Sequence, residues 1–117
     1  MSIKVEQLTK VYGNQKALNN VSFKVEKPEV VGFLGPNGAG KSTMMKIITG
    51  YIKASEGEVL VAGFNITSEK IEAQKNIGYL PEHNPLYLEM YVKEYLLFNA
   101  AIYKVAKTEV DNIIKKV

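Results

Sequence analysis

The stretch GPNGAGKST, from Gly35 to Thr43, brings together residue types that bind phosphate. A chain of this length would contain its pattern of Gly, four residues and Gly-Lys-Ser/Thr about 0.004 times by chance at average residue usage. Glycines let backbone N–H groups turn inward around a phosphate, the Lys41 ammonium reaches terminal phosphates, and the Ser42 hydroxyl suits Mg²⁺. The spacing predicts a nucleotide-binding loop, formed by Gly35, Pro36, Asn37, Gly38, Ala39, Gly40, Lys41, Ser42 and Thr43.

The segments on either side of this loop are suited to hold it. Residues 30–34, VVGFL, show no polar alternation, which predicts a strand covered on both faces, as in a parallel sheet. Residues 41–50 carry apolar side chains at helical spacing and end in glycine, which predicts a helix. The free N–H groups at the start of that helix would add partial positive charge to the loop.

The remaining pattern predicts further strands and helices. The strands are expected at 3–11 with a break near Gln7, at 21–25 after a turn at Asn19-Asn20, at 58–64 and at 77–80. Helices are expected at 68–75 with Ser68 as N-cap, at 92–106, and from a capping-box-like segment at 108–111 to the end. Strands and helices therefore alternate, and an α/β fold is predicted.

Composition narrows the functional classes. The chain has 117 residues, 46% hydrophobic and 23% charged, which fits one globular domain or part of one. Zero cysteines exclude disulfides and thiolate metal sites, and they fit a cytoplasmic protein. The net charge of +3 comes entirely from scattered lysines, without arginine, which argues against nucleic-acid binding.

Four segments resemble the N-terminal part of the ATP-binding subunit of ABC transporters: VYG near the start, VVGFLGPNGAGKSTMMKIITG, GEVLVAG and IGYLPEHNPLY. The resemblance covers essentially the whole chain, and within the family it is greatest to the bacterial exporter group that includes gliding-motility ATPases. It implies an α/β P-loop NTPase fold of the ABC type. Residues 1–82 would then form the nucleotide-binding core with Walker A, and residues 83–117 the start of a helical subdomain.

The resemblance also assigns site residues. It implies that Tyr12 stacks on the adenine of ATP, and that residues 35–43 are the Walker A loop. Glu82 stands where most members have the glutamine that touches Mg²⁺ and couples to the membrane subunit, so Ser42 and Glu82 are the expected metal ligands. The alternative for Tyr12 is a core or turn tyrosine, although its position favours stacking, and Glu82 could equally be a solvated turn residue.

Other motifs of the family do not occur in the sequence. There is no LSGGQ signature, and the single aspartate, Asp111, is followed by Asn112 in a helical pattern, not at the end of an apolar strand as Walker B requires. The chain is therefore expected to be truncated before the signature and Walker B motifs. It would bind ATP and Mg²⁺ without a catalytic residue of its own, as part of a parent ATPase.

The resemblance implies partners and a location for the parent protein. A membrane permease subunit and a second ATPase subunit are expected, at the inner face of the cell membrane. Three other functions use a loop of this kind. A small-molecule kinase usually holds phosphates with arginines, and a GTPase needs an Asn-Lys-x-Asp motif; the sequence has neither. A non-catalytic module that responds to nucleotide stays open.

Overall fold

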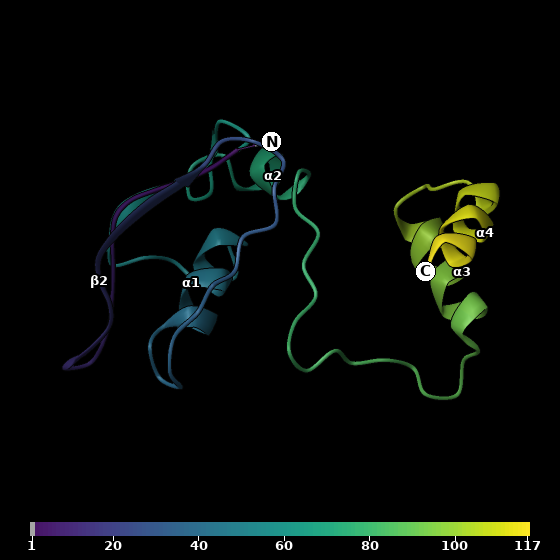
Figure 1. Ribbon diagram of the computed structural model, residues 1–117, viewed down its shortest axis with the longest axis horizontal. Helices are drawn as coiled ribbons and strands as arrows, with labels where there is room; N and C mark the ends of the chain where they lie inside the picture. The colour runs from purple at the N-terminus through teal and green to yellow at the C-terminus, as the bar shows by residue number, and fades with distance from the viewer. Residues whose placement is uncertain (1) are drawn as a thin grey trace. The chain divides into compact units, whose positions relative to one another are not determined.

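The computed structural model describes residues 2–117, which divide into two compact units, one ending at Tyr79 and the other comprising Leu80–Val117. The first unit contains a four-stranded sheet with two helices, and the second contains two helices (Figure 1). This mixed α/β content agrees with the fold class predicted from the sequence. Each unit is described by itself below.

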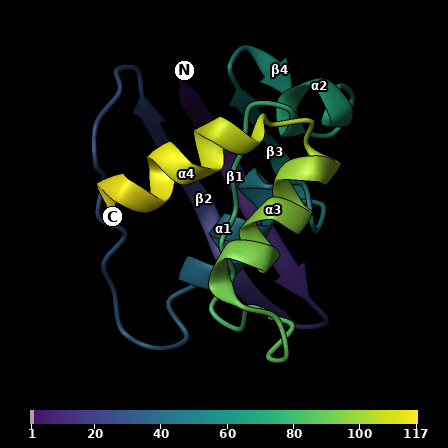
Figure 2. The ribbon, with the colours of Figure 1, turned by 90° about the vertical axis from the view of Figure 1, so that its right-hand side faces the viewer.

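The sheet of the first unit has the strand order β2-β1-β3-β4, and every neighbouring pair is antiparallel. Figure 2 shows the central strand β1 between β2 and β3. The strands are β1 (Ile3–Tyr12), β2 (Gln15–Val25), β3 (Glu56–Val61) and β4 (Phe64–Asn65). The long hairpin β1–β2 is the largest element of this unit.

Two irregularities interrupt the β1–β2 hairpin. Gln7 has a φ of 47° and lies at a register shift between Val5 and Leu8, which confirms the break expected near Gln7. The turn expected at Asn19-Asn20 is wrong, because β2 continues through both residues. Asn20 instead takes a φ of 50° inside the strand, and its N–H donates to Thr9 Oγ1 at 3.0 Å. The bond to the Thr9 side chain takes the place of a backbone hydrogen bond between the strands, so β2 continues through this residue.

Helix α1 (Lys41–Ile48) packs on one face of the sheet and forms the core with it. Met44 and Ile47 are at most 1% exposed, and the helix ends close to the predicted terminator Gly50. Burying these side chains is the main stabilising term of the unit. The buried members of the cluster are Val5, Leu8, Leu18, Met44, Ile47, Ile48, Val59, Val61, Ile66 and Ala73.

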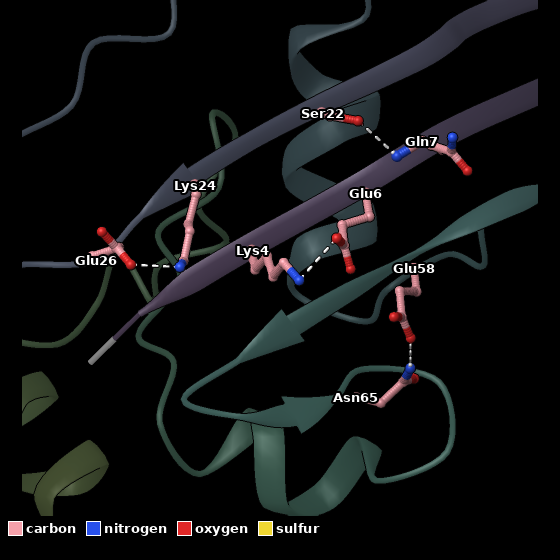
Figure 3. A network of polar contacts seen from close by, with 8 residues as sticks. All are labelled: Lys4, Glu6, Gln7, Ser22, Lys24, Glu26, Glu58 and Asn65. Atoms are coloured by element: carbon pink, nitrogen blue, oxygen red, sulfur yellow. Dashed lines mark hydrogen bonds and ion pairs between the residues drawn. The ribbon is translucent and has the colours of Figure 1, made fainter.

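The other face of the sheet is polar, because side chains alternate along each strand. Figure 3 shows Lys4 paired with Glu6 at 2.8 Å, and Asn65 Nδ2 donating to Glu58 at 2.9 Å. The same face carries an ion pair between Lys24 and Glu26. These are exposed pairs, and each contributes little to stability.

The strand expected at residues 30–34 is absent. The segment is extended but joins no ladder in the described part of the chain, and Val30 and Leu34 are almost fully exposed. Its one aromatic anchor is Phe33, whose ring centroid lies 5.3 Å from that of Phe23 on β2. A buried strand needs neighbouring strands, and none of the strands in the described residues pairs with this segment.

Three further expectations need correction. No strand forms at residues 77–80, where Ile77 packs against the core but Leu80 is exposed. Residues 58–64 form the end of β3, a turn and the start of β4, since Ala62 takes a φ of 52°. Helix α2 (Lys70–Gln74) is shorter than predicted, because Asn65 Oδ1 accepts the N–H groups of Thr67 and Ser68 and holds that segment in a turn.

The second unit consists of α3 (Val92–Ile102) and α4 (Lys107–Lys116) with the segment before them. The predicted helix at 92–106 ends earlier, in a turn where Lys104 has a φ of 56°. Lys93 on α3 pairs with Asp111 on α4 at 2.7 Å, and this hydrogen bond lowers the pKa of the Asp111 carboxyl. Among residues 2–117, no helix has the length and apolar character needed to cross a bilayer.

The same substitution at two valines, one in the core and one in the exposed segment 30–34, tests this difference in burial. Val59→Ala should lower the free energy of unfolding by about 2 kcal/mol, because it deletes buried methyl groups and leaves a cavity. Val30→Ala makes the same chemical change at an exposed position and should shift stability by no more than about 0.5 kcal/mol. Urea unfolding of both variants measures the difference. Equal losses would show that residues 30–34 are packed in solution.

Candidate phosphate-binding site

The loop predicted to bind phosphate follows the extended segment at 30–34 and runs into helix α1. Its residues 35–39 are exposed, and the N–H of Ala39 donates to the carbonyl of Pro36 at 3.2 Å, closing a turn. Gly38 and Gly40 have φ values of 84° and 87°, a region that side chains rarely adopt. The predicted helix begins at Lys41, so the last three residues of the loop motif, 41–43, belong to the first turn of α1.

Gly40 has a second reason to be glycine. A Cβ built on it would run into the carbonyl oxygen of Ala17 and lie 2.7 Å from Leu18 Cδ2. Both neighbours belong to β2, and Leu18 is part of the core. The end of the loop is therefore pressed directly against the backbone of the hairpin, which fixes where α1 begins.

Lys41 supplies the positive charge of the loop. Its Nζ donates to the carbonyl oxygens of Gly35 at 2.5 Å and Pro36 at 2.7 Å. The side chain thus turns back from the helix to the beginning of the loop. This position gives a phosphate group a charged donor beside the backbone of the loop itself.

The start of α1 is also left open to an anion. Its N-cap, Gly40, has no side chain to bond the first-turn N–H groups, and the first turn contains no acidic residue. Such N–H groups carry the positive end of the helix dipole. Ser42 is exposed in this turn and Thr43 is partly buried. An uncapped helix start, a lysine ammonium and a glycine-rich turn are features that favour an anion.

Tyr12 lies at the turn end of the same hairpin, close to the contact between Gly40 and Ala17. It is the last residue of β1, pairs with Gln15 across the turn, and is 50% exposed. Ala17, which Gly40 approaches, follows Gln15 by two residues on β2. The aromatic ring predicted to stack on a base belongs to this hairpin, and the loop predicted to hold phosphate contacts it through Gly40.

Lys10 is a further residue at the Tyr12 ring, and no sequence motif identifies it. Its Nζ lies 5.0 Å from the centroid of the Tyr12 ring and donates to the carbonyl of Lys53 at 2.7 Å. The signal that could have found it is the strand period of two, which puts residues 10 and 12 on one face.

Glu82, the second expected metal ligand, is exposed in a bend of the second unit, whereas Ser42 belongs to the first. Their joint role in binding magnesium stays a prediction. Within residues 2–117, no group of three or more histidine, aspartate or glutamate side chains is placed to hold a metal ion.

Comparison with known proteins gives a consistent result. The family model described as ABC transporter matches residues 18–117, which include the loop but not Tyr12. The chain is 40% identical over 96% of its length to rat ATP-binding cassette sub-family A member 2. It is 35% identical over 97% of its length to a bacitracin transport ATP-binding protein of Bacillus licheniformis. A solved structure of an ATP binding subunit of an ABC transporter matches 93% of the chain with a TM-score of 0.78 and 31% identity.

The chain is much shorter than these relatives. It spans 5% of the rat protein, 37% of the Bacillus protein and 45% of the chain in the solved structure. The comparison therefore bears on the part of those proteins that the chain matches.

The two left-handed glycines of the loop provide a matched test. Gly38→Ala adds a Cβ in open space and should cost roughly 1–2 kcal/mol for its φ alone. Gly40→Ala bears the same strain and also forces Ala17 to move, which should add about 1–3 kcal/mol. Urea unfolding monitored by circular dichroism compares them. If both variants lose the same stability, the loop does not press on β2 as described.

Proposed function

Because the chain belongs to the ABC transporter family, we propose that it is the nucleotide-binding part of an ABC transporter ATPase subunit, with ATP and Mg²⁺ as its ligands. The observation that carries the proposal is the Lys41 ammonium, held over the carbonyls of a loop that leads into an uncapped helix. Lys41 is the one charged residue in the sequence GPNGAGKST, and its positive charge suits a polyphosphate.

Each residue of the site has a proposed task. Phosphate oxygens take hydrogen bonds from the loop and first-turn N–H groups, and Lys41 exchanges its loop carbonyls for the terminal phosphates. Tyr12 stacks on the adenine. Bound Mg²⁺ would supply charge neutralisation at the phosphates. Ser42 offers it a hydroxyl, and Glu82 is the proposed second ligand.

For the complete protein we propose the activity of the family. ATP binding and hydrolysis would be coupled to transport through a membrane permease subunit, with two ATPase subunits acting together at the cytoplasmic face of the membrane. The name of the Bacillus relative, which describes a transport ATP-binding protein, supports this assignment. The substrate of transport depends on the permease and is not part of the proposal.

The 117-residue chain itself is proposed to bind ATP without turning it over. Phosphoryl transfer to water requires a residue that orients the attacking water, which the family places beside the Walker B carboxylates. The single aspartate of the sequence is Asp111, and its carboxylate is engaged with Lys93 between α3 and α4. That ion pair gives the aspartate a structural partner within the second unit.

Lys41→Ala tests the phosphate site. Losing a charge-assisted bond to phosphate should cost about 1.5–3 kcal/mol, which corresponds to roughly 10- to 150-fold weaker binding of Mg·ATP. Lys46→Ala is the control, because Lys46 is exposed on the same helix and lies in its last turn. Isothermal titration calorimetry gives both affinities. Binding that is unchanged in Lys41→Ala would refute the role of the loop.

Turnover by the chain is tested separately. The rate of phosphate release by the unaltered chain should equal that of the Lys41→Ala variant, because the proposed site contains no carboxylate that orients the attacking water. A phosphate-release assay with saturating Mg·ATP measures this. Hydrolysis that depends on Lys41 would contradict the proposal and point to a catalytic group among the described residues.

A further inference from the structure

Lys10 connects three parts of the first unit. It lies on β1, its ammonium contacts the ring of Tyr12, and its hydrogen bond to the Lys53 carbonyl reaches the segment that follows α1. Nearby backbone bonds strengthen this connection, since Ser55 N donates to the Thr9 carbonyl at 2.9 Å and Val11 N donates to Ser55 Oγ at 3.0 Å. The hydrogen bond to the Lys53 carbonyl therefore holds the Lys10 ammonium in place over the Tyr12 ring.

The contact restricts Tyr12 in a way that matters for a ligand. An aromatic ring attracts a cation to its face, so an ammonium 5.0 Å from the centroid occupies one side of the Tyr12 ring. The ring is nevertheless 50% exposed. A flat ligand can therefore stack on the remaining accessible surface, against a ring whose orientation is already set.

The geometry points to Lys10 as a positioning residue for the base of the bound nucleotide, acting through Tyr12. This inference rests on the proposed nucleotide site. Lys10 holds the ring before the ligand arrives, so less conformational freedom is lost when the base stacks. Its contribution concerns the base alone, because its ammonium is engaged by Tyr12 and the Lys53 carbonyl.

Titrations with two ligands distinguish this role of Lys10 from a general effect of its positive charge on phosphate binding. Mg·ATP uses both the loop and Tyr12, whereas the magnesium complex of inorganic triphosphate uses the loop alone. Lys10→Met should weaken Mg·ATP binding about two- to five-fold, the range expected for an exposed cation–π contact. It should leave triphosphate affinity unchanged. Lys10→Arg keeps a cation that can lie over the ring, so it should retain the affinity of the original protein for Mg·ATP.

Two controls accompany the titrations. Lys16→Met removes the same charge from the same hairpin, but Lys16 contacts Asn19 on β2 instead of the ring, so neither ligand should lose affinity. In a Tyr12→Leu background, Lys10→Met should have no further effect. Circular dichroism confirms that each variant is folded, so that an equal loss of affinity for both ligands reflects binding and not unfolding.

The outcomes are distinct. A selective loss for Mg·ATP that arginine restores supports the inference. An equal loss of affinity for both ligands would mean that Lys10 acts on phosphate binding, and this would overturn the inference. Unchanged affinity for both ligands would overturn it as well. If the unaltered chain binds triphosphate and Mg·ATP equally, the base contact fails while the phosphate loop stands. If it binds neither ligand, the proposed function and this inference fail together.

Discussion

The approach of Gly40 to the backbone of Ala17 determines the arrangement of the first unit. A helix can pack on a sheet at several positions along the strands. The apolar side chains of α1 alone would allow the helix to slide slightly along its own axis. The absence of a Cβ at Gly40 lets the loop close against β2, and this contact sets the first residue of α1. Because Leu18 belongs to both the contact and the core, the loop and the hydrophobic packing are determined together.

Local chemistry explains why much of this could be predicted. The loop and helix α1 follow from the spacing of glycines, lysine and apolar residues within a short segment, and the structure places α1 at Lys41–Ile48. The break at Gln7 follows from the interrupted alternation of residues 3–11. In both cases the signal lies in residues that are close in sequence, so no distant partner is needed to interpret it.

The expectations that were wrong depend on hydrogen-bond partners that residue type alone does not identify. The apolar run at 30–34 has the composition of a buried strand, but strand formation requires partners in the sheet, and the sheet formed here runs β2-β1-β3-β4 without it. The start of α2 was misplaced for a subtler reason. Ser68 is a favourable cap by type, but the side chain of Asn65 already holds its N–H, and a competing hydrogen bond of this kind is not visible from residue preference.

Lysine chemistry connects the site to the scaffold. The sequence uses lysine for every basic residue, and two of these ammonium groups are bound by backbone carbonyls: Lys41 by the loop, and Lys10 by Lys53. A compact ammonium can satisfy one or two carbonyls and still present its charge to a further group. For Lys41 we propose phosphate as that group, and for Lys10 the structure shows the Tyr12 ring. Both charges are thus positioned by backbone carbonyls before a ligand binds.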